Sequence, residues 1–382
     1  MRPVSIAITN CHTHTFTNRH TPLYYPLFFF ALFRIMPYTV GALRWLSSWL
    51  GNGSRLYNFM VRMEKFHNTG RRGTQRDVFQ ELVRHYPRST RFIVLPLDLT
   101  PIGHGPVRES IGAQMAELHE LAQDPLLGHQ VIPFATIHPD NPDGVREFLK
   151  AVEEYEFKGL KLYPGSGFAP DHPVLMRDVY PVCEAKGLPV MTHCSRGGLR
   201  RKGWTRAQAE AASRPRAFEP VMKSFPNLRV CLAHFGGDQD WHAYLDEGTD
   251  PYHPENNKEN WLKDILDMIR SGDYPNLYTD ISYTIFKFEK FVPLLKLFLG
   301  EPGDPKPLKR VLDVREKVLF GSDFYMTRQE GHSEKEISIR LRNALGEELF
   351  RQIAETNPKA YLDGAPPKKK KRGRKVSDYG IH

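Results

Sequence analysis

Short apolar segments alternate with amphipathic segments along most of the chain. The apolar segments are rich in Val, Ile and Leu without polar alternation, which is typical of strands buried on both faces of a parallel sheet. Strands are predicted over residues 4–9, 92–97, 130–137, 159–163, 188–194, 228–233, 277–281 and 318–320. Helices are predicted over residues 74–86, 111–122, 143–155, 174–185, 218–225, 261–270, 288–299, 335–345 and 348–356.

The regular order of strand and helix predicts an α/β protein with a (β/α)8 barrel of the TIM type. A doubly wound nucleotide-binding sheet is disfavoured, because no Gly-x-Gly-x-x-Gly or Gly-x-x-x-x-Gly-Lys-Ser/Thr loop follows a predicted strand. The 382-residue chain is long enough for one barrel with insertions. We divide it into a barrel over residues 1–362, with an insertion at 16–72, and a tail over 363–382.

The insertion is rich in aromatic residues. The stretch from Leu23 to Met36 is strongly apolar, and the pattern continues through Trp45 and Trp49. Its uninterrupted part is shorter than the about 20 residues of a spanning helix, so no transmembrane segment is predicted. Loops after the first strand overhang the catalytic face of a barrel. We therefore expect a lid over the site or an interface that forms a homo-oligomer, with a peripheral membrane anchor as the alternative.

The composition of the chain indicates its cellular compartment and a separate C-terminal tail. The chain is 40% hydrophobic and 25% charged, as in a soluble globular enzyme. Its four cysteines are scattered without a Cys-x-x-Cys pair, and no signal peptide is recognised, so we expect a cytoplasmic protein. Of the formal net charge of +9, six belongs to the segment from Ala365 onward, which has seven Lys/Arg and one Asp. Such a like-charge block predicts a flexible tail that binds polyanions weakly or is a plain solubilising extension.

Histidines and an aspartate stand at the ends of the predicted strands. His12 and His14 form a His-x-His pair after the first strand, and strand alternation places both on one face. His193, His234 and Asp323 end three later strands. A barrel brings the carboxyl ends of its strands to one face, so we expect these side chains to converge. Three imidazoles and one carboxylate with an open position would form a catalytic metal site.

Several segments together resemble the amidohydrolase superfamily. The chain is similar to the amidohydrolase-related branch, which contains hydrolases and metal-dependent decarboxylases of unsaturated or aromatic acids. The matching segments are His12-Thr13-His14, Phe157 to Pro164, Pro189 to His193, Leu232 to Gly237, Tyr278-Thr279-Asp280, Phe320 to Asp323 and Glu355 to Ala360. The resemblance implies one divalent metal, usually Zn²⁺ with Mn²⁺ as the alternative, held by His12, His14, His193 and Asp323. It also implies an acid/base role for His234 beside the water or substrate.

The expected reaction is hydrolysis of an amide, ester or lactone bond in a small carboxylate-bearing substrate. A bound metal lowers the pKa of water to about 7, and Asp323 can accept the proton and pass it to the leaving group. Two alternatives stay open. One is non-oxidative decarboxylation of an unsaturated or aromatic acid, and the other is a non-catalytic binding protein that acts through the basic tail.

Four further residues are candidates for supporting roles. Lys161 would meet a substrate carboxylate if one metal is bound, or would be carboxylated and bridge two metals as in two-metal relatives. Arg196 is a second candidate for the substrate carboxylate, with an exposed surface charge as the alternative. Tyr163 replaces a histidine that relatives often have, and we expect it to contact substrate. Asp280 is expected to orient a ligand histidine, with a helix cap as the alternative.

Overall fold

The computed structural model describes residues 6–25, 31, 36, 38–49, 51, 54–246, 259–284, 287–300, 313–327 and 333–364. Its strands are β1 (Thr9–Thr13), β2 (Arg91–Val94), β3 (Val131–Pro133), β4 (Ala135–Thr136), β5 (Leu160–Leu162), β6 (Val190–Ser195), β7 (Val230–Gly236), β8 (Leu277–Asp280) and β9 (Val318–Leu319). The α-helices are α2 (Tyr38–Ser48), α3 (Arg55–Gly70), α4 (Gln75–Val83), α5 (Ile111–Ala122), α6 (Gly144–Glu153), α7 (Tyr180–Lys186), α8 (Arg206–Ser213), α9 (Glu219–Ser224), α10 (Asp238–Asp246), α11 (Trp261–Ser271), α12 (Phe288–Leu299), α14 (Glu334–Arg351) and α15 (Asn357–Asp363). Short 3-10 or π segments are η1 (Asn18–His20), η2 (Thr100–Ile102), η3 (Gly128–Gln130), η4 (Pro164–Ser166), η5 (Leu175–Val179), η6 (Pro215–Phe218) and η8 (Gln352–Thr356).

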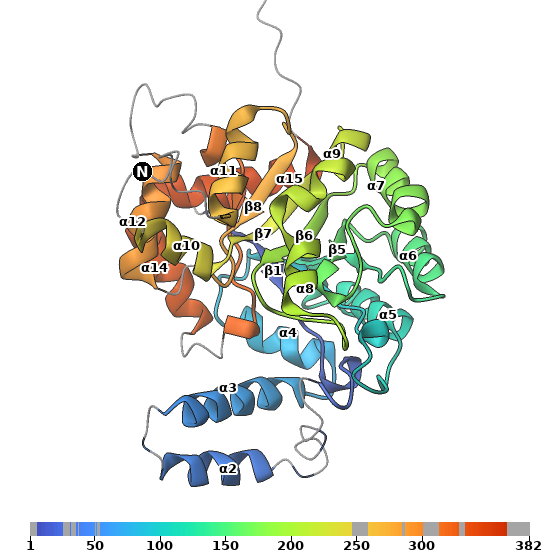
Figure 1. The fold of residues 1–382 in the computed structure, drawn as a ribbon, viewed down its shortest axis with the longest axis vertical. Helices are drawn as coiled ribbons and strands as arrows, with labels where there is room; N and C mark the ends of the chain where they lie inside the picture. Colours follow the sequence, from blue (N-terminus) through green and yellow to red (C-terminus); the bar gives the residue numbers. More distant parts are fainter. Residues whose placement is uncertain are drawn as a thin grey trace, which may run out of the picture.

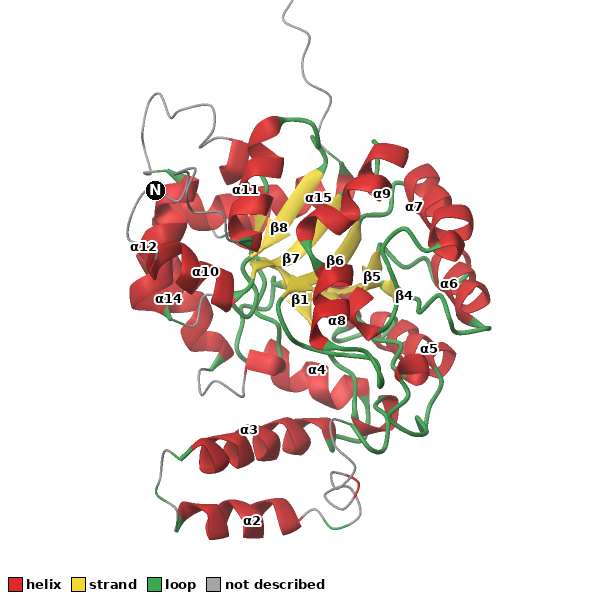
Figure 2. Cartoon of the chain, in the orientation of Figure 1, coloured by secondary structure: helices red, strands yellow, loops and turns green. Residues whose placement is uncertain are grey.

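All strands are parallel, and they lie at the centre of the molecule with helices around them (Figure 2). Strands pair in sequence order from β1 to β3 and from β4 to β9. β3 and β4 are two halves of one strand, separated by Phe134. The N–H of Phe134 donates to the Val94 carbonyl at 3.1 Å, and the N–H of Ala135 donates to the Gly159 carbonyl at 2.8 Å. The two halves therefore join the two paired groups into one sheet.

The sheet closes where the first and last strands meet. The N–H of Cys11 donates to the Phe320 carbonyl at 2.8 Å, and Thr13 forms a parallel bridge with Phe324. Closure confirms the predicted (β/α)8 barrel and abolishes exposed sheet edges. It also places the two ends of the barrel sequence next to each other, on the side where the polar candidates stand.

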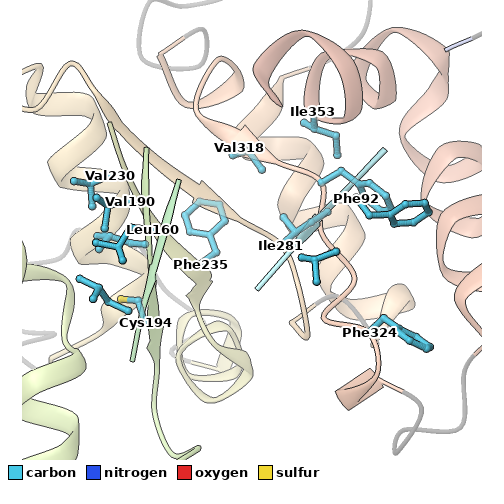
Figure 3. Close-up of a cluster of buried hydrophobic side chains, with 14 of the residues drawn as sticks. Phe92, Leu160, Val190, Cys194, Val230, Phe235, Ile281, Val318, Phe324 and Ile353 are labelled. Carbon is cyan, nitrogen blue, oxygen red and sulfur yellow. The ribbon is translucent and has the colours of Figure 1, made fainter. Parts of the chain in front are cut away.

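Alternate side chains of each strand lie in two different apolar layers. One layer lies between strands and helices, and Figure 3 shows part of it, including Leu160, Val190 and Val230. The second layer fills the barrel interior and contains Cys11, Ile93, Leu95, Ile132, Phe134, Met191, Cys231, Ala233, Tyr278, Leu319 and Tyr361. The corresponding position on β5 is a lysine, because Lys161 stands in register with Met191 of β6. A buried amine therefore interrupts an otherwise apolar interior.

Most predicted elements are confirmed within two residues at each end. Thr74 is the N-cap of α4, since its hydroxyl accepts from the Asp77 N–H, and Gly187 ends α7 in the left-handed conformation with φ 62°. The first strand is wrong: β1 begins at Thr9 and so contains His12, and residues 4 and 5 lie outside the described part of the chain. The helices α8, α10 and α15, like α2 and α3 of the insertion, lie outside the helices predicted from the sequence.

The insertion is more regular than its sequence indicates. It contains two antiparallel helices, α2 and α3, joined by a short connection, and this hairpin lies on one side of the barrel with α3 nearer to it (Figure 1). Phe66 of α3 packs against Phe16 and Tyr325, with ring centroids 6.5 and 5.4 Å apart. Most of the apolar stretch between Leu23 and Met36, and the basic segment from Ala365 onward, lie outside the described residues. Among the helices that are described, none is both long and apolar enough to cross a membrane.

Candidate metal centre

The five predicted site residues converge at one mouth of the barrel. His12 comes from β1, His193 from β6 and His234 from β7, while His14 directly follows β1 and Asp323 lies four residues after the end of β9. All five are buried. Ring centroids lie 5.3 Å apart for His12 and His14, and 4.8 Å apart for both His12–His234 and His193–His234. Parallel strand order alone accounts for this convergence.

Three of the histidines have a fixed tautomer. The Nδ1–H of His12 donates to Oδ2 of Asp280 at 2.9 Å, that of His14 to the Leu95 carbonyl at 2.7 Å, and that of His234 to the Ser282 carbonyl at 3.0 Å. Each ring therefore keeps a lone pair on Nε2, as a metal-ligating imidazole needs. Burial lowers the pKa of His234, and burial together with Lys161 lowers the pKa of His12 to about 3, so both rings stay neutral.

Asp323 supplies the carboxylate that faces these nitrogens. Its Oδ1 lies 3.3 Å from Nε2 of His14 and 3.7 Å from Nε2 of His12. This buried oxygen accepts no hydrogen bond within the described part of the chain. One ligand atom each from His12, His234 and Asp323 lie within 4.8 Å of one another. Burial opposes the charge of Asp323, but the adjacent His14 and the other nearby histidines hold its pKa below the usual range.

This donor set fits a divalent metal ion. Neutral imidazole nitrogens and one ionised carboxylate are the ligands that Zn²⁺ and similar cations take in catalytic sites. A buried, ionised oxygen without a hydrogen-bond donor is costly unless a cation compensates for it. The orphaned Oδ1 of Asp323 is therefore the strongest sign of a metal position.

His193 is turned away from that position. Its ring stacks on Tyr163 with centroids 4.1 Å apart, and its Nε2 lies 3.2 Å from both the Tyr163 hydroxyl and Oγ of Ser195. The Tyr163 hydroxyl accepts from the Leu199 N–H at 3.0 Å and also shares a hydrogen bond with Nε2 of His193. Ligation through Nε2 would replace that hydrogen bond. Burial lowers the pKa of His193 well below its usual value, so its ring is neutral.

Lys161 and Arg196 differ in how their charges are compensated. Nζ of Lys161 lies 3.4 Å from Nε2 of His12, and burial lowers the pKa of this lysine to about 8. The Arg196 guanidinium donates to Asp240 at 2.9 Å and to Glu210 at 3.4 Å, and it lies over the Trp261 ring at 4.7 Å. Arg196 also lines the cavity, but its charge is paired with carboxylates of the chain. Lys161 has no such direct partner among the ion pairs that the structure describes.

Asp280 stands behind His12 and is joined by a residue that sequence analysis missed. Oγ of Ser282 donates to Oδ1 of Asp280 in a short hydrogen bond and lies 3.0 Å from Nδ1 of both His12 and His234. Oδ1 of Asp280 also accepts from the His234 N–H at 3.0 Å. Burial opposes ionisation, but His12 holds the pKa of Asp280 well below its usual range. The only sequence signal for Ser282 is its place two residues after Asp280 at a strand end.

Two site residues have a left-handed backbone. φ is 68° at His234 and 58° at Asp323, values that cost energy for residues with a Cβ. Hydrogen bonds hold both: the His234 N–H donates to Asp280, and the Asp323 N–H donates to the His12 carbonyl at 2.8 Å. Such conformations persist where surrounding contacts over-determine them, which is common at functional sites.

A buried polar network supports the loop that carries Asp323. Nδ2 of Asn10 donates to Oγ of Ser322 at 2.9 Å and to the Tyr86 hydroxyl at 3.1 Å. Tyr86 donates to Glu334 at 2.8 Å, and Thr327 donates to the same carboxyl at 2.9 Å. Burial raises the pKa of Glu334. None of these supporting residues is singled out by the sequence analysis, because their partners are distant in the chain.

A cavity of about 410 Å³ opens onto the centre. His12, His14, Lys161, His193, His234 and Asp323 form its polar end. The rest of the wall is largely apolar and includes Phe16, Tyr25, Leu97, Leu99, Tyr163, Leu199 and Met326. The insertion also contributes to this wall through Met63 and Phe66 of α3.

A second cluster of metal-ligand type lies outside this cavity. Nε2 of His20 is 3.0 Å from Glu109 and 3.4 Å from Glu117. The Thr17 N–H donates to Nδ1 of His20 at 3.0 Å, so the proton of the neutral ring is on Nε2. That nitrogen donates to the carboxylates and has no lone pair for a cation. This cluster is therefore a structural hydrogen-bond network.

Comparisons with known proteins agree with this geometry. A TIM-barrel protein from Bordetella bronchiseptica, itself uncharacterised, is 14% identical and has a TM-score of 0.53, covering 94% of this chain and 98% of its own. The 5-carboxyvanillate decarboxylase of Sphingomonas paucimobilis is 13% identical with a TM-score of 0.50, covering 94% and 99%. The 5-carboxyvanillate decarboxylase of Novosphingobium aromaticivorans, complexed with manganese and 4-hydroxy-3-methoxy-5-nitrobenzoic acid, is 13% identical with a TM-score of 0.50, covering 93% and 96%.

At sequence identities of 13–14%, the similarity to these solved structures shows only that the fold is shared. No curated protein matches the chain. The family assignment comes from the sequence itself. The family model described as Amidohydrolase matches residues 111–363, which contain His193, His234 and Asp323 but not the His12–His14 pair. That match covers more than half of the chain, and the two remaining histidines stand in the same centre, so this protein belongs to the amidohydrolase family.

Proposed function

We propose that the protein is a metal-dependent hydrolase of a small substrate with an amide, ester or lactone bond. The observation that carries the proposal is the orphaned Oδ1 of Asp323, which faces the Nε2 atoms of His12 and His14. His12, His14 and Asp323 would hold one Zn²⁺ or Mn²⁺, with His193 joining them by releasing Tyr163. A bound cation there supplies Lewis acidity and lowers the pKa of water to about 7.

The residues of the chain would manage the proton. Asp323 accepts the proton of the attacking water at Oδ1 and returns it to the leaving nitrogen or oxygen. His234 remains neutral because burial lowers its pKa, and its Nδ1–H is committed to the Ser282 carbonyl. Its Nε2 lone pair can therefore orient the water by accepting a hydrogen bond. Asp280 and Ser282 keep His12 and His234 in the required tautomers.

The cavity suggests the kind of substrate. An apolar wall with polar groups at one end favours a molecule with an apolar body and one polar head. Lys161 is the cationic candidate for a substrate carboxylate, because Arg196 is already paired with Asp240. Tyr163 lines the same wall and would contact the substrate body. Four free, buried cysteines agree with a cytoplasmic enzyme.

The second candidate function is non-oxidative decarboxylation of an aromatic or unsaturated acid. Two structural neighbours are named as decarboxylases, and one of them is complexed with manganese. In that reaction Asp323 would deliver a proton to carbon after CO₂ leaves, so the same residue would act in both chemistries. The two reactions differ in the fate of solvent atoms.

That difference gives the experiment. The metal-loaded protein is incubated with a panel of amides, esters, lactones and aromatic acids in water labelled with ¹⁸O and deuterium. Hydrolysis places one labelled oxygen in the product. CO₂ release with deuterium on the product carbon and no new oxygen would overturn hydrolysis in favour of decarboxylation. Neither reaction across the panel, at full metal occupancy, would favour a binding protein.

A further inference from the structure

The outer face of α2 exposes large apolar side chains. The exposed fraction is 86% for Tyr38, 61% for Trp45 and 72% for Trp49, and Leu46 is 53% exposed. Positions 38, 45 and 49 follow helical spacing, so they form one stripe, and the two tryptophan rings lie 5.1 Å apart. The three aromatic side chains alone expose roughly 400 Å² at ordinary aromatic surface areas. An exposed patch of that size marks an interaction site.

The hairpin has small and polar groups on its inner side. Ser47 is buried, and the Cβ position at Gly41 lies 3.6 Å from a carboxylate oxygen of Glu64 on α3. Arg44 reaches across to Glu64 at 3.0 Å. The large apolar residues of α2 therefore point away from the helix that supports it, the reverse of a helix that packs on a protein core. Figure 1 shows α2 as the outermost element on this side of the molecule.

The hairpin has a net positive charge. Glu64 is the first acidic residue of the chain, and six arginines precede it. Between Tyr38 and Gly70 the sequence has Arg44, Arg55, Arg62 and Lys65 against one acidic residue, Glu64, which is a net charge of +3. A segment with this net charge and exposed aromatic residues is complementary to anionic lipid headgroups, because tryptophan and tyrosine favour the bilayer interface and arginine binds phosphate.

We propose that the α2–α3 hairpin docks this protein on the surface of anionic phospholipid bilayers, with Tyr38, Trp45 and Trp49 entering the interface. A second copy of the chain fits less well, since an isologous contact would bring together two hairpins that each have a net positive charge. The inference does not depend on the proposed reaction.

Vesicle flotation tests the proposal with the full chain. We expect the protein to float with phosphatidylcholine–phosphatidylglycerol vesicles, much less with phosphatidylcholine alone, and less at high salt. The double variant W45Q/W49Q should lower the bound fraction about tenfold, because both side chains would leave the interface. A matched control is L126Q/L297Q, which removes two leucines that are each 72% exposed elsewhere and should float like the wild type.

Two further measurements separate the alternatives. Brominated lipids should quench tryptophan fluorescence of the wild type and not of W45Q/W49Q, which reports insertion without relying on a loss of binding. A chain ending at Gly364 should still float, since the docking surface lies in the hairpin. Loss of flotation on truncation with no effect of W45Q/W49Q would assign binding to the basic tail and overturn the proposal. The proposal would also be overturned if the wild type did not bind vesicles but formed a dimer in solution, and if W45Q/W49Q dissociated that dimer.

Discussion

The Nδ1–H of His12 donates to Oδ2 of Asp280 over 2.9 Å, deep under the floor of the cavity. Because this carboxylate is ionised, it determines which nitrogen of His12 carries the proton. Nε2 is left with its lone pair on the side of Asp323, 3.7 Å from Oδ1. A residue that does not line the cavity thus determines whether His12 can bind a metal.

Replacing Asp280 by alanine should weaken metal binding by about 10- to 100-fold, the usual effect of losing the carboxylate behind a ligand histidine. The measurement is a competitive titration of Zn²⁺ against a chromogenic chelator. Asp280→Asn retains an acceptor and should fall between the wild type and alanine. Asp178→Ala, which breaks a surface ion pair with Arg177, is the control and should leave the affinity unchanged. Equal affinities for Asp280→Ala and the wild type would remove Asp280 from this role.

Metal analysis should find about one equivalent of Zn²⁺ or Mn²⁺ per chain, since one carboxylate oxygen and three imidazoles define one position. Removing the metal with a chelator should lower the melting temperature, because an ion that binds only the folded state stabilises it. Elemental analysis and thermal unfolding provide the two measurements. Two equivalents would instead make Lys161 a carboxylated bridging ligand, and a Lys161→Met variant would then lose one of them.

Asp323→Asn should lower turnover by about 10²- to 10⁴-fold, because the amide keeps the shape and loses the proton acceptor. Rates are measured at saturating metal, and bound metal is determined separately, so that loss of the ion and loss of the base are distinguished. Circular dichroism checks the fold. Asp178→Asn serves as the matched control and should keep the full rate. A near-normal rate for Asp323→Asn would show that another group moves the proton.

Glu334→Gln should change the pH dependence of stability. Burial raises the pKa of Glu334, so the stability that its protonated form contributes is fully present below the ordinary glutamate pKa. It is lost as the pH rises through the raised value. Glutamine cannot ionise and does not lose this contribution. The free energy of unfolding of the variant should therefore increase relative to that of the wild type as the pH rises. Urea unfolding at several pH values measures the difference.

In Glu334→Gln the amide nitrogen replaces one carboxyl oxygen that accepts from Tyr86 or Thr327. The lost hydrogen bond changes the free energy of unfolding by an amount that does not vary with pH. The prediction therefore concerns the slope of the difference and not its sign at one pH. Glu336→Gln on the exposed side of the same helix is the control and should show no comparable slope. Parallel curves for Glu334→Gln and the wild type would contradict a raised pKa.

The barrel could be predicted from the sequence because its signal is local and repeated. Each buried strand is an apolar run, and each site histidine stands at the end of one. Parallel strand order then brings His193, His234 and Asp323 together without knowledge of any contact. The same logic placed Lys161 on β5, although only the structure shows that it interrupts the apolar interior.

The rest depends on contacts between distant residues. Ser282 lies beside His12 across 270 positions of sequence, and Glu334 reaches Tyr86 across 248. The hairpin was missed because the large apolar residues of α2 face outward, so the periodicity of that helix does not describe burial against the barrel. The tautomers of His14 and His234 depend on the carbonyl oxygens of Leu95 and Ser282, which no side-chain pattern encodes.

The closure of the barrel between β1 and β9 has a consequence for synthesis. Cys11 bonds to Phe320, and the His12 carbonyl accepts from Asp323, so the centre joins groups from both ends of the barrel. A nascent chain on the ribosome carries the His-x-His pair from the beginning, yet it cannot form the site until the residues around Asp323 have left the exit tunnel. Capture of the proposed metal ion would then be a late event, because it requires that the first and last strands have already met.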